Sequence, residues 1–588
     1  MKNFLEVIAE DVQKAFAEAG YDAALGRVTF SNRPDLCEVQ CNGAMAGAKQ
    51  YKKAPLVIAN DVAERLAGSK TFSKVEAVAP GFLNMDLEPA FVLSYIEKMM
   101  GEEKFGVNAP EKQQTIVIDY GGPNVAKPLH VGHLRPAIIG ESIKRIARYA
   151  GHKVIGDVHL GDWGMPMGQI ITELKVRKPD LPYFQEDFSG EYPEEAPFTI
   201  SELEEIYPFA SKKCKEDDDY KKLALQATAD LQNGKPGYRA LWKQILNVSV
   251  TDLKKNYEKL DVCFDLWMGE SDADPYIPPM VEKMKADGHA HISEGALVVD
   301  VKKEDDKKEI PPCMILKSDG AANYETTDLA TIMQREKDFA PDAIIYVVDK
   351  RQELHFDQVF RCARKTGIVR DTTDLQFIGF GTMNGPDGKP FKTRDGGVLR
   401  LEHLLGQIKD KMYARIMENK ELDPAEAEDT AAKIALAAVK YGDLSNQASK
   451  DYIFDVDRFT SFEGDTGPYL LYTMVRIKSI LAKYQEANGA LPIEGRMIPD
   501  SKAQKEVLKD MAGFPAMIAD AFAERAPHKV CAYMYQMAND FNSFYHGTKI
   551  LGEEDAVKQK GYIMLLRDAL KIFETCTGLL GFTAPERM

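Results

Sequence analysis

One short apolar segment and the loop behind it constrain the fold of this chain more than any other feature. Residues 115–120 (TIVIDY) are mostly β-branched or apolar, which is typical of a strand buried on both faces of a parallel sheet. The segment GGP at 121–123 ends that strand, and from about His133 apolar residues recur at helical spacing as far as Gly151. The sequence therefore predicts a strand, a loop and a helix, which together form the building block of an α/β fold.

The loop after this strand contains the sequence HVGH at residues 130–133. A helix that begins there directs unpaired backbone N–H groups and a partial positive charge toward the loop, which suits a phosphate chain. Gly132 would let phosphates approach the backbone, and His130 and His133 would donate hydrogen bonds as negative charge builds up at the α-phosphorus. The pattern therefore predicts an ATP site, and the alternative is a histidine that only caps the helix.

A second glycine-rich loop, at residues 385–397 (GPDGKPFKTRDGG), is cationic and precedes an apolar helix start. It lies roughly 250 residues after the first loop, where the second half of a nucleotide-binding sheet would bring the two loops opposite each other. Lys392 and Arg394 are its candidate phosphate contacts. The alternative is a solvated surface turn.

Both loops resemble the signature motifs of one enzyme family. The first resembles the HIGH motif and the second the KMSKS motif of class I aminoacyl-tRNA synthetases. The local sequences of both loops are similar to those of the arginyl-tRNA synthetases. Further segments similar to that family are VHLGDWG at 158–164, KSDG at 317–320, YETTDLA at 324–330, YVVDKRQELHF at 346–356, FEGDTGPY at 462–469, FNSFYH at 541–546 and GLLGF at 578–582. The resemblance therefore extends through most of the chain, to its C-terminus.

The resemblance implies an arginine–tRNA ligase that works in two steps. The carboxylate of L-arginine attacks the α-phosphorus of ATP to form arginyl-adenylate and pyrophosphate, and a ribose hydroxyl of tRNA(Arg) then takes the arginyl group and releases AMP. Positioning and charge stabilisation supply most of such catalysis. By resemblance, His130, Gly132 and His133 hold ATP, and Lys127 places a cation near the α-phosphate.

The second loop departs from the family pattern, because it lacks the central methionine and serine of KMSKS. Whether Lys392 or Arg394 replaces the usual lysine therefore stays open. Enzymes that resemble this chain usually activate arginine only when tRNA is present, and we predict the same dependence here.

Recognition of arginine requires acceptors that match a planar guanidinium with five N–H donors. By resemblance, Tyr324 and Asp328 bind the guanidinium, Asp119 and Asn124 approach the α-amino and carboxylate end, and Gln352 completes the pocket. Tyr324 and Asp328 are four residues apart, so a helical segment would place both on one face. For any one of these carboxylates alone, a solvated or capping role is the alternative.

The resemblance also implies contacts with tRNA. Phe82 and Asn84 are the candidates for an exposed base at the tRNA elbow, and Tyr469 and Tyr472 are the candidates near the anticodon loop. Met588, at the end of the chain, resembles the family terminus and is a further candidate contact. Aromatic residues at helical spacing are more often core residues, which is the alternative for the two tyrosines.

Shifts in sequence pattern predict three domains. Residues 1–105 are predicted to form a small N-terminal α+β domain, which by resemblance contacts tRNA. Residues 106–400 are predicted to form an α/β domain, by resemblance the Rossmann-type catalytic domain of the class I synthetases, with an insertion near 175–300 that is rich in charged residues. Residues 401–588 alternate long amphipathic stretches with short loops, which predicts an all-α bundle, and the resemblance implies that it binds the anticodon.

Composition agrees with a large cytoplasmic enzyme. The N-terminal segment carries acidic residues within its apolar pattern, unlike a signal peptide, and no apolar run approaches the length of a membrane span. The net charge of −16 lowers the general affinity for RNA, but acid-rich stretches can lie on one face while a basic, aromatic surface lies elsewhere. No heptad repeat requires a dimer, so a monomer is expected.

Metal chemistry is expected only through the nucleotide. The eight cysteines are too scattered for a disulfide framework or a zinc ribbon, which also argues against the related cysteinyl-tRNA synthetases and their zinc-held thiolate. Mg²⁺ is expected with ATP, held mainly by phosphates and water, so no protein ligand is named.

Two other functions remain possible at this point. The first is another enzyme of the HxGH type that joins a small acid to a nucleotide, although such chemistry does not need a long helical C-terminus. The second is an RNA-binding module that has lost catalysis. The presence of Lys127, His130, His133 and Asp328 argues against that loss.

Overall fold

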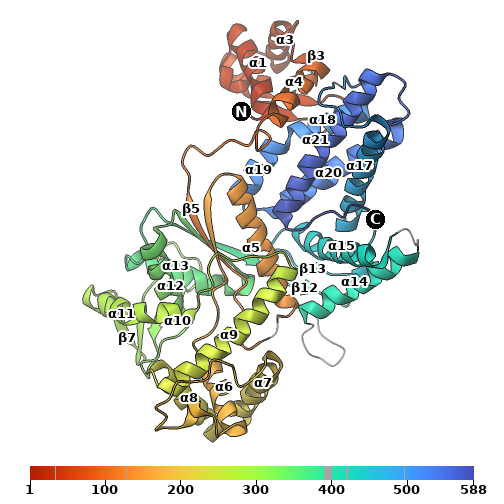
Figure 1. Ribbon diagram of the computed structural model, residues 1–588. Helices are drawn as coiled ribbons and strands as arrows, with labels where there is room; N and C mark the ends of the chain where they lie inside the picture. The colour runs from red at the N-terminus through yellow and green to blue at the C-terminus, as the bar shows by residue number, and fades with distance from the viewer. Residues whose placement is uncertain (34, 128, 390–399, 419–421, 496) are drawn as a thin grey trace. The chain divides into compact units, whose positions relative to one another are not determined.

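The computed structural model describes residues 1–588 except 34, 128, 390–399, 419–421 and 496 (Figure 1). The described chain forms two compact units. Unit 1 comprises Met1–Pro110, Phe462–Leu579 and Thr583–Met588, and unit 2 comprises Glu111–Ser461 and Leu580–Phe582.

A parallel sheet organises unit 2. Its strands are β5 (Thr115–Tyr120), β6 (Lys153–Asp157), β10 (Ala343–Asp349) and β11 (Asp374–Phe380), in the order β11-β10-β5-β6. The chain moves outward from β5 to β6 on one side and from β10 to β11 on the other, so the strand order reverses between β5 and β10. Open parallel sheets bind ligands beyond the carboxyl ends of their strands at such a reversal. The HVGH loop follows β5 and therefore lies at this point.

Crossover helices connect the parallel strands. They are α5 (Val131–Tyr149) between β5 and β6, α12 (Tyr324–Phe339) before β10, and α13 (Glu353–Lys365) between β10 and β11. The predicted strand, loop and helix at 115–149 are thus confirmed, and the buried pattern of β5 agrees with a strand covered on both faces.

The segment between β6 and α12 holds two further groups of elements. The first is helical and consists of α6 (Met165–Arg177), η2 (Pro182–Phe184), α7 (Ile200–Glu216), α8 (Asp218–Gln232) and α9 (Pro236–Lys259). The second contains α10 (Glu270–Ala273), η3 (Asp274–Tyr276), α11 (Ile277–Ala286) and the antiparallel strands β7 (Ala290–Ser293), β8 (Ala296–Val299) and β9 (Cys313–Leu316). Unit 2 continues with η4 (Lys350–Gln352), β12 (Met383–Asn384), α14 (Leu401–Glu418), α15 (Pro424–Leu444), β13 (Tyr452–Ile453) and α16 (Val456–Phe459).

Unit 1 combines an α+β part with a set of long helices. The sequence pattern predicts an α+β domain here, and the structure shows one, with an antiparallel sheet of order β1-β2-β4-β3. Its elements are α1 (Phe4–Glu18), η1 (Ala23–Leu25), β1 (Thr29–Phe30), β2 (Val39–Cys41), α2 (Gly43–Tyr51), α3 (Pro55–Leu66), β3 (Phe72–Val78), β4 (Phe82–Leu87) and α4 (Pro89–Met100). The helices are α17 (Gly467–Asn488), α18 (Lys502–Ala512), α19 (Phe514–Ala523), α20 (Pro527–Gly547) and α21 (Ala556–Leu580), and α18 packs on α4 and α20.

Helix α5 is buried along most of its length and is fixed by charged side chains. Near its start, Arg135 is 2% exposed and forms an ion pair with the fully buried Asp443 of α15, with 2.9 Å between Nε and Oδ2. The same guanidinium donates to the carbonyl oxygens of Gly381 and Lys450 at 2.6 and 3.1 Å. The first turns of α5 are therefore held to the segments that follow β11 and α15.

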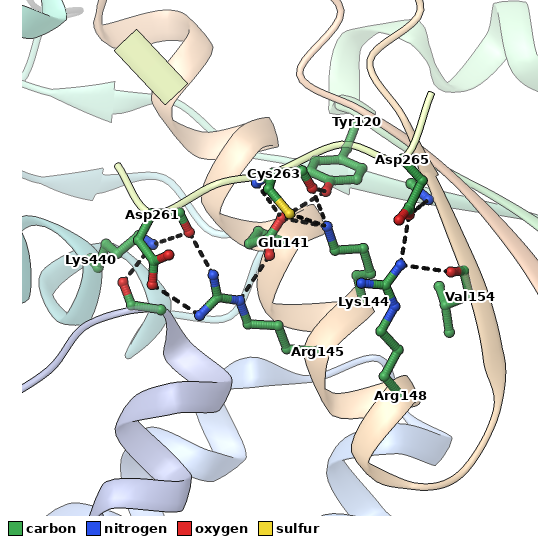
Figure 2. Close-up of polar contacts among 12 residues, drawn as sticks. Tyr120, Glu141, Lys144, Arg145, Arg148, Val154, Asp261, Cys263, Asp265 and Lys440 are labelled. Atoms are coloured by element: carbon green, nitrogen blue, oxygen red, sulfur yellow. Dashed lines mark hydrogen bonds and ion pairs between the residues drawn. The ribbon is translucent and has the colours of Figure 1, made fainter. Parts of the chain in front are cut away.

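A second polar network holds the later turns of α5 (Figure 2). The buried Glu141 carboxylate accepts from the Tyr120 hydroxyl at 2.8 Å and from Arg145 Nε at 2.8 Å, and it pairs with Lys144 Nζ at 2.9 Å. Arg145 also pairs with Asp261 at 3.0 Å, so strand β5, helix α5 and the turn after α9 are joined.

The C-terminal segment of unit 2 reaches this network through a buried lysine. Lys440 of α15 donates to the carbonyl oxygens of Gly581 at 2.7 Å and Asp261 at 3.3 Å. Burial together with the nearby charge of Arg145 lowers the pKa of Lys440 to about 7. A side chain at Gly581, whose φ is +78°, would collide with the Lys440 ammonium, so the close approach requires glycine there.

Candidate active site

The two histidines of the HVGH sequence cap helix α5 with their own rings. The N–H of Gly132 donates to Nδ1 of His130, the N-cap residue, at 3.1 Å. The N–H of His130 in turn donates to Nδ1 of His133 at 3.1 Å, which is the reciprocal arrangement of a capping box. The ring centroids lie 3.9 Å apart.

These hydrogen bonds determine which nitrogen of each ring carries a proton. Because Nδ1 of each ring accepts a backbone N–H, the proton of each neutral ring is on Nε2. Burial lowers the pKa of His130, and burial together with the charges of His130 and Lys127 lowers the pKa of His133 to about 3. Both imidazoles are therefore neutral near pH 7 and each presents an Nε2–H donor. Helix capping and phosphate binding are compatible, because they use different nitrogens.

Gly132 is required by its neighbour as well as by access to the backbone. A Cβ atom at this position would lie 2.8 Å from Cε1 and 2.9 Å from Nδ1 of His130. Either the ring or the backbone would have to move, because contacts below 3.0 Å are not tolerated. Gly132 thus allows the His130 ring to fold back onto the first turn of α5.

The cation of the first loop lies beside this helix start. Lys127 Nζ is 4.5 Å from the ring centroid of Tyr207 on α7, a cation–π contact. The preceding residue, Ala126, has a φ of +60° and donates its N–H to Ser249 Oγ of α9 at 3.0 Å. The helices inserted after β6 therefore position the loop that carries Lys127.

The chain that follows the second predicted loop lies beside the first one. Lys392 and Arg394 lie outside the described residues, and the description resumes at Arg400. Arg400 pairs with His130 as an antiparallel bridge, and the Leu401 N–H donates to the Leu129 carbonyl at 3.1 Å. The backbone at Arg400 and Leu401 is thus adjacent to the HVGH segment.

The residues predicted to bind guanidinium lie in the first turns of α12. Tyr324 is the first residue of the helix and is 74% exposed, and Asp328 follows one turn later on the same face. The Asp328 Oδ2 atom lies 2.5 Å from Nε2 of His355 on α13. Asp328 thus has a polar partner that the sequence reasoning did not assign.

The other predicted arginine ligands follow the carboxyl ends of β5 and β10. The carboxylate of Asp119 is buried and accepts from Arg335 NH2 at 2.6 Å, and the same NH2 group contacts Asp157 at 2.8 Å. Burial raises the pKa of Asp119 although the charge of Arg335 opposes this shift. Asn124 and Gln352 are exposed, Asn124 beside the HVGH loop and Gln352 at the start of α13. One oxygen of Asp119 is therefore already used inside the protein.

One acidic residue of this region escaped the sequence reasoning. Glu270 begins α10, and burial together with the charges of Asp162 and Asp328 raises its pKa to about 7. Burial and the charge of Glu270 raise the pKa of Tyr324. Glu270 therefore lies near both predicted guanidinium ligands. Its surroundings in sequence do not distinguish it from the many other acidic residues of the insertion.

The residues predicted to contact tRNA are all in unit 1 and differ in exposure. Phe82 and Met588 are half-buried, and Asn84 is 9% exposed and accepts from Gln40 Nε2 at 2.8 Å. The amide oxygen of Asn84 is therefore occupied within the sheet.

The two tyrosines of α17 contribute to one aromatic and polar cluster. Tyr472 is 42% exposed, and the Arg476 guanidinium lies 4.9 Å from its ring centroid and 4.6 Å from that of Tyr545 on α20. Tyr469 accepts at its hydroxyl from Asn542 Nδ2 at 2.9 Å. Tyr472 thus offers an exposed ring backed by a cation, while Tyr469 supports the cluster from inside.

Comparison with known proteins assigns the family. A model described as "tRNA synthetases class I (R), catalytic domain" matches residues 96–456. Models of the arginyl-tRNA synthetase N-terminal domain and of the DALR anticodon-binding domain match residues 2–87 and 470–588. The chain is 62% identical to an arginine–tRNA ligase of Agathobacter rectalis and 54% identical to one of Alkaliphilus oremlandii, in both cases over 100% of each protein.

The chain belongs to the arginyl-tRNA synthetases.

Solved structures of this family show the same fold. An arginyl-tRNA synthetase of Plasmodium falciparum gives a TM-score of 0.80 at 22% identity, and that of Thermus thermophilus gives 0.77 at 20% identity, each over 100% of both chains. The predicted fold class is confirmed, as is the predicted ligation of arginine to tRNA(Arg) with ATP, in preference to the two alternative functions. None of the described helices is long and apolar enough to cross a membrane.

We predict that Gly132→Ala lowers the rate of arginine activation by about 10²-fold, the effect of losing one transition-state donor, because the new methyl group displaces the His130 ring. The measurement is arginine-dependent ATP–pyrophosphate exchange in the presence of tRNA. Gly406→Ala in α14 is the control, since a Cβ there meets nothing within 4 Å. Equal rates for the two variants would contradict the role of the ring geometry.

Proposed function

We propose that the start of α5 binds the triphosphate of ATP and stabilises the charge that develops at the α-phosphorus. The support is the pair of neutral Nε2–H donors from His130 and His133 at a helix N-terminus, with Lys127 beside them. Gly132 keeps the first turn open. Neutral imidazoles suit this task because each donates a hydrogen bond through Nε2–H without having to gain or lose a proton.

We also propose that Lys392 or Arg394 completes the phosphate contacts from the second loop. The hydrogen bond between Leu401 and Leu129 supports this, because it joins the end of that loop to the HVGH segment. Mg²⁺ accompanies ATP and is held by its phosphates and by water, which suits an ion that keeps much of its hydration shell.

The reaction then needs little covalent chemistry from the protein. An oxygen of the arginine carboxylate bonds to the α-phosphorus, the bond to pyrophosphate breaks, and no proton is transferred. In the second step the oxygen of a ribose hydroxyl of tRNA bonds to the carbonyl carbon of the arginyl-adenylate, the bond from that carbon to the phosphate oxygen breaks, and AMP leaves while the hydroxyl proton is released. Residues that hold the substrates in line therefore provide most of the rate enhancement.

For arginine itself, we propose that Asp328 and Tyr324 bind the guanidinium and that Glu270 adds a second carboxylate. The support is the mutual electrostatic effect of these groups and their common place near the start of α12. One oxygen of Asp119 accepts from Arg335, and we propose that the other receives the α-amino group of arginine. The exposed Asn124 and Gln352 are proposed as the remaining substrate ligands.

We predict that Asp328→Asn raises the KM for arginine by roughly 10- to 150-fold, since a hydrogen bond to a charged partner contributes about 1.5–3 kcal/mol. Discrimination against citrulline should fall at the same time, because the pocket no longer requires a charged fork. Both are measured by pyrophosphate exchange with tRNA present. Asp338→Asn, an exposed position on the same helix, serves as the control. An unchanged KM in Asp328→Asn would exclude it as the guanidinium ligand.

The tRNA surface is proposed to lie on unit 1. Tyr472 stacks on a base near the anticodon and Tyr469 supports it, and the support for this is the exposed ring beside Arg476. Phe82, Asn84 and Met588 are proposed as further contacts. The half-buried ring of Phe82 suits stacking, whereas the Asn84 oxygen would first have to leave Gln40.

We predict that Tyr472→Ala raises the KM for tRNA by roughly 5- to 150-fold, which corresponds to about 1–3 kcal/mol for one stacked base. The KM for arginine should stay within about twofold, because the ring is remote in sequence from the arginine ligands. Steady-state aminoacylation with varied tRNA measures both constants. Leu551→Ala is the control, since Leu551 is 41% exposed in the same unit. Equal KM values for tRNA in the two variants would contradict base stacking and would mean that Tyr472 has only a structural role.

We propose that the enzyme acts in the cytoplasm as a monomer, with domain boundaries near residues 105 and 400. We further propose that arginine activation requires bound tRNA. The support for the boundary near 105 is that one family model ends at residue 87 and the next begins at residue 96, and the support for the boundary near 400 is the long helix α14 that begins at Leu401. The support for the cytoplasm is the ligase activity itself, which serves translation.

A further inference from the structure

His355 is a titratable residue of the family-like segment 346–356, and neither the sequence analysis nor the proposed mechanism gives it a role. It is the third residue of α13, and its side chain is 23% exposed. Its Nε2 atom lies 2.5 Å from Asp328 Oδ2, and its Nδ1 atom lies 3.9 Å from Glu325 Oε1. The edge of the ring packs against Phe356 at a centroid distance of 5.1 Å. The ring is thus held between a phenyl group and the acidic first turns of α12.

We propose that His355 is a positioning residue for arginine recognition, because its Nε2–H fixes the carboxylate plane of Asp328 for the incoming guanidinium. The proposal rests on the proposed role of Asp328 as the guanidinium ligand. His355 contacts the Asp328 carboxylate and does not contact the substrate itself.

The geometry of a guanidinium makes such positioning necessary. A planar fork with two parallel N–H donors needs both carboxylate oxygens in one plane, whereas an unrestrained aspartate rotates about its terminal torsion. An ionised carboxylate offers about four acceptor positions, so a hydrogen bond from His355 uses one and leaves the others for substrate. His355 can therefore orient Asp328 without blocking it.

The charge of His355 makes this device sensitive to pH. Burial lowers the pKa of His355, but the hydrogen bond to Asp328 and the charges of Asp328 and Glu325 outweigh burial and raise it overall. The N-terminus of α13 opposes the charged form of the ring. The protonated ring would partly neutralise Asp328 and so compete with the substrate guanidinium.

The other titratable groups around Asp328 come from three elements. Glu270 of α10 repels it, and the thiol of Cys313 on β9 and the phenol of Tyr346 on β10 are each affected by its charge. The hydrogen bond with Cys362 and burial raise the pKa of the thiol, and burial raises the pKa of the phenol, so both stay neutral at physiological pH. Glu270 and His355 are therefore the groups whose titration can change arginine binding near pH 7, and in both cases binding is stronger at higher pH.

The test is the pH dependence of the KM for arginine in pyrophosphate exchange with tRNA, for the parent enzyme, His355→Gln and His355→Leu. As the pH falls from about 8 to about 6, the KM of the parent enzyme for arginine should rise roughly tenfold, because Glu270, His355 or both bind a proton.

His355→Gln keeps an amide donor, so its KM at pH 8 should stay within about threefold of the parent value. The rise of its KM toward pH 6 should be shallower than in the parent. His355→Leu lacks the donor, and its KM at pH 8 should rise roughly tenfold with kcat changed less than about threefold.

Two comparisons make the outcome decisive. His403→Gln on α14, an exposed histidine, should leave both the KM and its pH profile unchanged. If Asp328→Asn raises the KM while the His355 variants keep the parent profile, His355 has no positioning role and the guanidinium assignment of Asp328 stands. If Asp328→Asn leaves the KM for arginine unchanged, the proposed arginine pocket is wrong. The proposed role of His355, which depends on that pocket, is then wrong as well.

Discussion

The buried charges that hold helix α5 are the interaction on which the rest of this structure depends. Arg135 pairs with Asp443 near the start of the helix, and Glu141 joins Lys144 and Arg145 further along it. Removing one partner of a buried pair commonly costs about 3–5 kcal/mol, because the other charge is left without compensation. A shift or rotation of α5 would therefore break these buried ion pairs at a large cost in free energy. Its first turn presents the histidine rings at a fixed place beyond the carboxyl end of β5.

The two ends of the proposed reaction centre have opposite electrostatic requirements. At the α5 terminus, burial keeps the imidazoles neutral, so each offers an Nε2–H donor to the phosphate chain that we propose binds there. Near the start of α12, where we propose that the guanidinium binds, burial together with the charges of Asp162 and Asp328 raises the pKa of Glu270. The strand order reverses between β5 and β10, and this reversal brings the two regions to one edge of the sheet. The net charge of −16 is thus compatible with binding ATP and RNA, because local groups determine each contact.

Sequence patterns predicted the features that depend on neighbouring residues. The β-branched segment at 115–120, the helix that follows it and the HVGH cap are local, so spacing alone was sufficient. The amphipathic C-terminal stretches likewise predicted helices. Pairings between distant residues were not predictable in this way. The contact between Arg335 and Asp119 joins residues 216 positions apart, and the one between His355 and Asp328 depends on how α12 and α13 pack. Glu270 was missed for the same reason, since only the fold brings it to Asp328. Lys392 and Arg394 remain predictions, outside the described residues.

The most direct test of the central claim, that α5 holds two neutral imidazoles as phosphate donors, is the protonation state of those rings. Long-range ¹H–¹⁵N NMR spectra of histidine-labelled enzyme, assigned with His130→Asn and His133→Asn, report the tautomer of each ring. From about pH 8 to about pH 6.5 both rings should appear as the neutral Nε2–H tautomer, and added ATP should shift both Nε2 signals. A ring that titrates near its ordinary pKa, or that carries its proton on Nδ1, would contradict the claim.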